Sequence, residues 1–348
     1  MIRSACVIAG IIPIAMSAAS PLYAASIYLD ALYGVSVTKN ITYTMAATTT
    51  GSVPLKLDVY QPTNIGLAAV LSNRPAIVIQ DGGAWVSASK ENGRVMDPAN
   101  YFTQRGYTVI VTDYRQGANN LLGNGGNVVP IVGQTAFGTQ PYAGISIPAI
   151  YQVFPGTAAI RAGIEDFAVA MAWTRSNAAS LGINPNLLCA TGGSAGGIDD
   201  LLLQYNNNPV NPAYAAQAVI GLVSTMYTNW NRVQAGGPPV FLLNNTLDPL
   251  IAYSPDIPNL VNRLNQVGIY NEPWQQVAQV NHDVDYNETL GGENVRERMR
   301  DFLAYHFAGG PIPIPEPSTF VLGLSAVVVL GVSPLRRRWS AVGSKARL

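Results

Sequence analysis

One serine stands between two pairs of glycines, directly after an apolar, strand-like stretch. The sequence around Ser194 reads CATGGSAGGIDD, and it continues the stretch NPNLLCAT. A serine in the pattern G-x-S-x-G is typical of a sharp strand-turn-helix, in which small residues allow close backbone packing and the hydroxyl projects above a sheet. Since a plain glycine-rich loop has the same letters, this pattern does not by itself identify a nucleophile.

A serine hydroxyl needs a base before it can act as a nucleophile. The chain has two histidines. His282, in VAQVNHDVDY, follows a strand-like segment and begins a short polar stretch, where a base at the edge of a sheet would lie. His306 shares one face of a predicted helix with Met299 and Phe302, so we interpret it as a packed or surface histidine. His282 is therefore the candidate base.

The imidazole in turn needs a carboxylate that holds its tautomer and stabilises its positive charge. Asp248, in PPVFLLNNTLDPLIAY, follows another strand-like run and should lie at the carboxyl edge of the sheet. Asp256 fits less well because it begins a predicted helix. Asp283 and Asp285 are too near His282 in the chain to reach its ring easily. We therefore expect Asp248 to be the partner of the histidine.

A second glycine pair follows the strand-like AIVIQ, in the sequence Asp81-Gly82-Gly83-Ala84-Trp85. Small residues there could turn backbone N–H groups toward a developing negative charge. The first N–H groups of the helix after Ser194 are available for the same purpose. An ordinary Gly-Gly turn is the alternative interpretation.

The elements that must position these residues form a mostly parallel sheet. NITYTM and VPLKLDVYQP alternate like antiparallel strands. The later segments are short continuous runs, as expected of parallel strands covered on both faces: AIVIQ, YTVIVTDY, NLLCAT, AVIGLVST, PVFLLN and WQQVAQV. Helical periodicity occupies residues 158–175 and 256–267. Strands that alternate with helices predict an α/β fold with helices on both faces of about eight strands.

One long segment, residues 116–157, has neither a helical nor a strand period. Loops of this length are usually functional or mobile. Its Ile, Val, Tyr and Phe residues favour a lid or cap with an apolar inner face. A structural insertion packed away from any site is the alternative.

Both ends of the chain resemble processing signals, so the expected folded domain is residues 26–310. Residues 1–25 combine Arg3, an apolar run and small residues, which is typical of a secretory signal peptide. Residues 311–348 combine Pro-Glu-Pro at 315–317, an apolar run over 320–335 and three arginines at 336–338. This pattern favours a membrane helix that anchors the chain transiently. A buried terminal helix is the less favoured interpretation.

The tail resembles the PEP-CTERM sorting signal of Gram-negative bacteria that make exopolysaccharide. That resemblance implies cleavage near residues 315–318 by an exosortase-type sorting enzyme. It also implies a destination in the cell envelope, at the cell surface or in the extracellular matrix.

The composition of the chain limits the classes of partner and cofactor that we expect. Of the 348 residues 48% are hydrophobic and 11% charged, and removal of both ends leaves the body with an excess of about five negative charges. A nucleic-acid partner would need a basic face, and none is expected. Cys6 lies in the leader and Cys189 in an apolar strand, where we interpret it as a core residue. With one histidine near the expected site, we predict no metal or organic cofactor.

Taken together, six segments resemble the α/β-hydrolase esterases and lipases of the hormone-sensitive lipase and feruloyl-esterase-like branch, over residues 40–307. They are LDVYQP, IQDGGAWVSASK, GYTVIVTDYR, GIEDFAVAMAWTRSNAASLGINPN, CATGGSAGG and NNTLDPLIAY. The resemblance implies an eight-stranded α/β-hydrolase fold, whose catalytic residues follow the chain order Ser194, Asp248, His282. It also implies that Gly83, Ala84 and Ala195 donate backbone N–H groups to the oxyanion.

The chain departs from this family at several positions. Asp81 stands where the family has histidine, and Ala84 where it has glycine. An inward-pointing carboxylate at 81 would disfavour an anionic intermediate. Asp199 and Asp200 replace residues that are mostly apolar, and as acids in the first turns of a helix they would suit its dipole.

The expected function is that of a secreted serine hydrolase that cleaves small-molecule or polysaccharide-linked carboxylic esters through an acyl-enzyme. A peptidase of the prolyl-oligopeptidase type would share the three catalytic residues, but roughly 15 residues between leader and first strand leave no room for its propeller. A non-catalytic envelope protein that binds polysaccharide or a partner is the other alternative, and Asp81 favours it. The sequence leaves xylan acetyl, feruloyl, glyceride and polyester substrates open.

Overall fold

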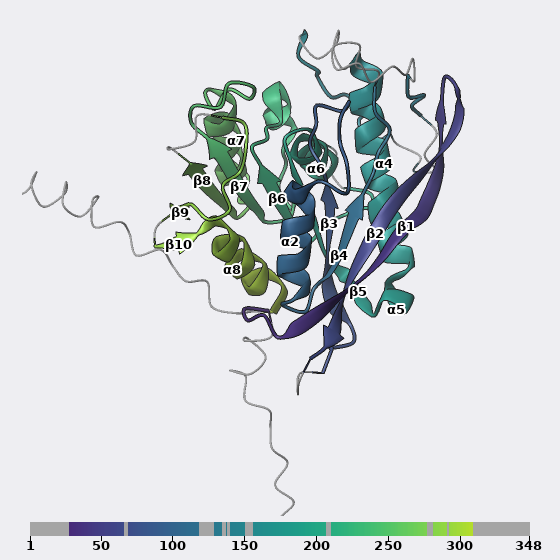
Figure 1. The fold of residues 1–348 in the computed structure, drawn as a ribbon. Coiled ribbons are helices and arrows are strands. Elements are labelled where there is room, and N and C mark those ends of the chain that lie inside the picture. Colours follow the sequence, from purple (N-terminus) through teal and green to yellow (C-terminus); the bar gives the residue numbers. More distant parts are fainter. Residues whose placement is uncertain are drawn as a thin grey trace, which may run out of the picture.

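Six parallel strands and two N-terminal ones form a single sheet at the centre of the molecule (Figure 1). The structure is a computed structural model and describes residues 28–65, 69–117, 129–133, 137, 140–149, 156–206, 210–276, 281–290 and 292–308. The sheet order is β1-β2-β4-β3-β5-β6-β7-β8. The strands are β1 (Tyr33–Thr48), β2 (Gly51–Asn64), β3 (Arg74–Gln80), β4 (Thr108–Thr112), β5 (Ile183–Gly193), β6 (Ala218–Leu222), β7 (Val240–Asn245) and β8 (Asn271–Gln276).

The directions of the strands confirm the predicted fold class. β2 is antiparallel to both of its neighbours, β1 and β4, and every pair from β4–β3 to β7–β8 is parallel. All eight predicted strand segments lie within or overlap these strands. The parallel strands therefore end at one common edge, after Gln80, Gly193 and Asn245 among others.

Helices cover both faces of the sheet because the side chains of each central strand alternate between them. In β3, Ala76 and Val78 pack into one buried cluster, while Ile77 and Ile79 pack into another. The first cluster lies under α4 (Thr157–Ser176), α6 (Ala195–Tyr205) and α7 (Asp256–Gln266), and the second under α2 (Gly93–Thr103) and α8 (Val295–Ala308). Shorter elements are α5 (Ala178–Leu181), the 3₁₀ helix η2 (Tyr227–Arg232) and the small hairpin β9 (Thr289–Leu290) and β10 (Glu293–Asn294).

The helical periods at 158–175 and 256–267 correspond to α4 and α7. Helix α2 has no counterpart among the predicted elements, and it contains Pro98 in its interior. A proline inside a helix removes one backbone hydrogen bond, so such a segment does not read as a helix from sequence. Asn92 begins it by accepting a hydrogen bond from the Arg94 N–H at 3.1 Å.

Parts of the predicted excursion 116–157 are described, and they pack on α4, η2 and the β1–β2 hairpin. The Gly133 N–H donates to Glu165 of α4 at 2.5 Å, and Ser146 exchanges two hydrogen bonds with Asn229. Pro130 pairs with Thr48 at the tip of the hairpin. Whether the segment covers the site stays a prediction, because residues 118–128 and 150–155 lie outside the described ranges.

The predicted signal peptide (1–25) and sorting tail (311–348) also lie outside the described residues, as does the predicted apolar helix at 320–335. Within the described ranges, no helix combines the length and the apolar character needed to cross a bilayer.

Gly163 of α4 allows the packing of this helix on α6. A Cβ at position 163 would lie 2.9 Å from Cδ1 of Trp85 and closer still to a carboxylate oxygen of Asp199. Alanine has a higher helix propensity than glycine. We nevertheless expect Gly163→Ala to lower the free energy of unfolding by about 1–3 kcal/mol, because the added methyl group overpacks the contact. Urea unfolding followed by circular dichroism measures this. Gly93→Ala is the matched control, because a Cβ there meets no atom within 4 Å; equal effects of both substitutions would contradict the prediction.

Candidate active site

Ser194 occupies a strained turn between β5 and α6. Its φ of 54° and ψ of −122° lie outside the regions that residues with a side chain normally adopt. Two backbone bonds hold the turn: the Ser194 N–H donates to the Leu222 carbonyl at 2.9 Å, and its carbonyl accepts from Ile198 N–H at 2.9 Å. The structure thus forms the strand-turn-helix that the glycine pairs predict.

The glycine after this turn is required by a close approach of two backbones. A Cβ on Gly196 would collide with the Gln80 carbonyl oxygen and lie 2.8 Å from that of Asp81. The first turn of α6 therefore rests directly on the carboxyl end of β3. Only glycine permits a contact this short.

His282 lies between Ser194 and Asp248 and is bonded to both. Its Nε2 is 2.6 Å from Ser194 Oγ, and its Nδ1 is 2.6 Å from Asp248 Oδ2. With the proton on Nδ1 donated to the carboxylate, Nε2 is left free to accept the hydroxyl proton of the serine. The structure therefore brings together the three residues that the sequence placed at the ends of three different strands.

The carboxylate of Asp248 is buried but well satisfied. Burial opposes its ionisation, but the hydrogen bonds from His282 and from the N–H groups of Ile251 and Leu250 outweigh burial and lower its pKa below the ordinary value. Those two N–H groups donate to Oδ1 at 2.9 and 2.8 Å, while Oδ2 faces the imidazole. Asp248 is therefore held as an anion that can stabilise an imidazolium.

Asn245, at the end of β7, fixes the loop that carries the histidine. Its side-chain amide donates to the carbonyls of Asn281 at 2.9 Å and Asp283 at 2.7 Å, the residues on either side of His282. Sequence reasoning missed this residue. The only available signal was its position at the end of the strand before Asp248.

His306 and Asp283, the alternatives to His282 and Asp248, make different contacts. His306 packs edge-on against Tyr270, Phe302 and Tyr305, and burial lowers its pKa to about 4. Asp283 forms a 3.7 Å ion pair with Arg94. Cys189 is fully buried in β5, where burial raises its pKa well above the ordinary value, so it is a poor nucleophile.

The second glycine pair forms a loop that packs against the serine turn. Gly83, Ala84 and Trp85 have φ values of 80°, 51° and 58° in succession. At Gly82 a Cβ would lie 2.9 Å from the Gly193 carbonyl oxygen and 3.0 Å from Ser194 Cβ. The backbone of Gly82 therefore borders Ser194. So does the start of α6 at Ala195, whose N–H has no acceptor within the helix.

A buried acid connects this loop to α6. Asp199 Oδ1 accepts from the Trp85 indole N–H at 3.0 Å, and Oδ2 accepts from the Gln80 amide at 2.5 Å. Burial raises the pKa of Asp199 and of Asp200 well above the ordinary value. Neither acid lies exposed in the first turn of the helix, so the interpretation that they complement its dipole was wrong. Asp199 instead orients the loop that follows β3.

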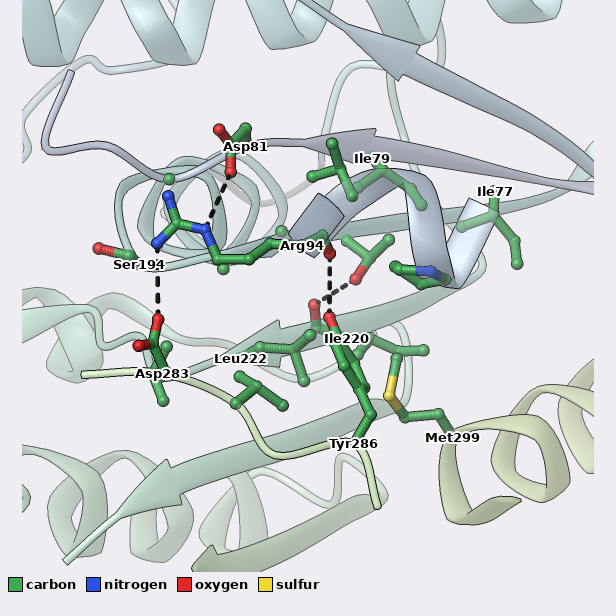
Figure 2. Close-up of a pocket in the computed structure, with 18 of the residues that line it drawn as sticks. Ile77, Ile79, Asp81, Arg94, Ser194, Ile220, Leu222, Asp283, Tyr286 and Met299 are labelled. Carbon is green, nitrogen blue, oxygen red and sulfur yellow. Dashed lines mark hydrogen bonds and ion pairs between the residues drawn. The ribbon is translucent and has the colours of Figure 1, made fainter. Parts of the chain in front are cut away.

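Asp81 lies beside Ser194, but its charge is compensated (Figure 2). Its side chain is only 2% exposed. Oδ2 accepts a hydrogen bond from the Ser89 N–H at 2.9 Å, and Oδ1 lies 3.9 Å from Nε of Arg94. The guanidinium of Arg94 therefore stands between this carboxylate and that of Asp283.

No protein-family model and no curated protein matches the chain. Solved structures do, at low identity. Esterase 2 of Thermogutta terrifontis, phosphoramylated by tabun, has a TM-score of 0.50 and 18% identity over 86% of this chain and 96% of that one. The form of that planctomycete esterase with propionate bound has a TM-score of 0.50 and 18% identity over 86% and 95%.

The form phosphonylated by sarin gives a TM-score of 0.50 and 18% identity, over 86% of this chain and 96% of that one. These similarities extend over most of both chains. At 18% identity, these similarities are evidence about the fold alone. Together with the strand order and the mostly parallel sheet flanked by helices, they show that the chain has the α/β-hydrolase fold.

Proposed function

We propose that the chain is a serine hydrolase that cleaves carboxylic esters. The observation that carries this proposal is the pair of 2.6 Å contacts from Ser194 to His282 and from His282 to Asp248, at a strained turn between a strand and a helix. The structures with a similar fold support it, since they are described as those of an esterase that reacts with tabun and sarin and binds propionate.

In the first half of the reaction, His282 takes the proton of Ser194 as Oγ attacks the ester carbonyl carbon. The C=O electron pair moves to the oxygen, which becomes an oxyanion. When the tetrahedral intermediate collapses, the C–O bond to the alcohol breaks and His282 gives its proton to the departing oxygen. The acyl group remains on Ser194 Oγ as an ester.

Water then attacks the acyl-enzyme in the same way. His282 removes a proton from the water, a second oxyanion forms, and collapse returns the proton to Ser194 while the carboxylic acid leaves. Asp248 keeps the proton of the neutral imidazole on Nδ1 and offsets the charge that His282 gains in each half. Neither half of the cycle needs a redox change or a metal ion in this proposal.

The oxyanion is stabilised by the backbone N–H groups of Ala195, Gly83 and Ala84 in this proposal. Ala195 begins α6, so the positive end of the helix dipole adds to its N–H. The charge of Asp81, which would oppose an anion here, is offset by Arg94 and by the Ser89 N–H. The departure from the family at position 81 is therefore compatible with catalysis.

We further propose that the protein is exported and acts in the envelope or extracellular matrix of a Gram-negative bacterium. The apolar leader at 1–25 and the PEP-CTERM-like tail at 311–348 support this. The tail would hold the chain in the membrane until an exosortase-type enzyme cleaves it. The assignment to the hormone-sensitive lipase and feruloyl-esterase-like branch belongs to the same proposal.

Replacement of Ser194 by alanine should abolish ester hydrolysis without unfolding the protein. Turnover of p-nitrophenyl acetate and butyrate should fall by about 10³-fold or more, because the nucleophile is lost. Ser180→Ala, on the exposed side of α5, is the control and should keep full activity. If Ser194→Ala and the parent protein hydrolyse both esters equally fast, the proposal fails and the non-catalytic alternative gains.

Replacement of Asp248 by asparagine should lower kcat by about 10³–10⁴-fold, because the amide favours the wrong tautomer of His282. The lowered pKa of Asp248 keeps it charged in acid, so its protonation should not limit kcat of the parent protein from about pH 5 to pH 9. Measurements of kcat for the parent protein and for Asp248→Asn across this pH range test both points. Asp256→Asn, at the start of α7, should change neither kcat nor its pH profile; a similar loss in that variant would contradict the assignment.

A further inference from the structure

Tyr114, two residues after β4, is a buried tyrosine whose hydroxyl lies against the loop that follows β3. Its side chain is 3% exposed and belongs to the same buried cluster as Trp85 and Ala195. The hydroxyl donates to the Gly82 carbonyl at 2.5 Å. Burial raises the pKa of Tyr114 well above the ordinary value, so the hydroxyl keeps its proton at neutral pH and remains a donor.

The same hydroxyl also binds the other end of this loop. The Trp85 backbone N–H donates a hydrogen bond to it, which acts against the effect of burial on the pKa of Tyr114. Gly82 and Trp85 are the first and last residues of the oxyanion loop, residues 82–85. One side chain therefore holds both ends of the loop.

The bond to Gly82 sets the direction of the next N–H group. The peptide group between Gly82 and Gly83 is trans, so its carbonyl and its N–H point in opposite directions. The carbonyl is directed at Tyr114, which lies in the buried cluster. The Gly83 N–H therefore points away from this tyrosine.

The following peptide group is fixed by the loop itself. The Gly83 carbonyl accepts from the N–H groups of Val86 and Ser87, at 2.9 Å each, so the Ala84 N–H points away from that turn. Among the residues that the structure describes, the N–H groups of Gly83 and Ala84 have no acceptor. The loop thus leaves free the two N–H groups that the proposed mechanism uses.

This conformation of the loop has to be held in place. Ala84 and Trp85 carry side chains but have φ values of 51° and 58°. Such residues persist only where the surrounding structure enforces their conformation. Asp199 binds the indole of Trp85, whereas Tyr114 binds the backbone at both ends of the loop. Without this hydroxyl, the peptide groups of the loop could turn while the indole stayed anchored.

We propose that Tyr114 is a positioning residue for ester hydrolysis, because its hydroxyl holds the oxyanion loop in the conformation that directs the N–H groups of Gly83 and Ala84. The inference rests on the proposed serine hydrolase function. Tyr114 acts through the backbone of Gly82 and Trp85 rather than on the substrate. Since donors stabilise an oxyanion best when they are already oriented, its loss should weaken the tetrahedral intermediates more than the bound ester.

Tyr114→Phe is the direct test, because it removes the hydroxyl and keeps the ring. We expect kcat for p-nitrophenyl acetate to fall by about 10–100-fold, somewhat less than for the outright loss of an oxyanion donor. KM should stay within about threefold of the parent value. His282 and Asp248 are untouched, so the acidic limb of the pH–rate profile should not move.

Inhibition by 1,1,1-trifluoroacetone separates positioning from a loss of folded protein. Ser194 Oγ adds to the ketone carbon, the C=O electron pair becomes an oxyanion, and the serine proton passes to His282. In Tyr114→Phe the inhibition constant should rise by about the factor by which kcat/KM falls, as expected of a transition-state analogue. A smaller folded fraction would lower the rate and leave the inhibition constant unchanged.

Tyr205→Phe is the matched control. Tyr205 is also 3% exposed, and its hydroxyl donates to the Pro238 carbonyl at 2.8 Å. It ends α6, at the opposite end of the helix from Ala195. The variant loses the same kind of buried hydrogen bond away from the oxyanion loop, so kcat and the inhibition constant should stay within about twofold of the parent values.

Tyr114→4-aminophenylalanine serves if phenylalanine prevents folding, as judged by circular dichroism. Its amino group still donates to the Gly82 carbonyl but is a poor acceptor for the Trp85 N–H, so kcat should fall by about threefold to tenfold. A folded Tyr114 variant with the parent kcat and inhibition constant, while Ser194→Ala is inactive, overturns the role of Tyr114 and leaves the proposed function standing. If the parent protein hydrolyses no ester, the proposed function itself fails.

Discussion

The site depends on the contact between the first turn of α6 and the end of β3. Gly196 lies against the Gln80 carbonyl, and this contact sets how far Ser194 rises above the sheet. The loop after β3 must then turn away sharply, which it does through three successive residues with positive φ. Asp199 connects the two sides, because it accepts hydrogen bonds from both Gln80 and Trp85. The nucleophile and the oxyanion loop therefore have a common support.

Such a site is costly to build, and the rest of the fold provides the compensation. The Ser194 turn is strained, and two acids in α6 are buried. The strands beneath them are almost completely buried and packed on both faces, which stabilises a rigid base. The charge of Asp81, near the site, is matched by the Ser89 N–H and by Arg94.

Much of this could be predicted from sequence. Apolar runs located the strands, and residues at the ends of strands located Ser194, Asp248 and His282, because parallel strands end at one edge. The rest depends on contacts between distant parts of the chain. Trp85 and Asp199 are 114 residues apart, and nothing in either segment alone shows that they meet. Helix α2 was missed because of Pro98, and with it Arg94, which lies between Asp81 and Asp283.

The two bonds from Asn245 have a mechanical consequence. β7 carries Asn245 and leads directly into Asp248, so the imidazole and its carboxylate are suspended from one strand. The loop that carries His282 is also connected to α2, because Arg94 pairs with Asp283 and the Tyr286 hydroxyl donates to the Arg94 carbonyl. The position of the carboxylate therefore depends on β7, whereas the position of the imidazole depends on both β7 and α2.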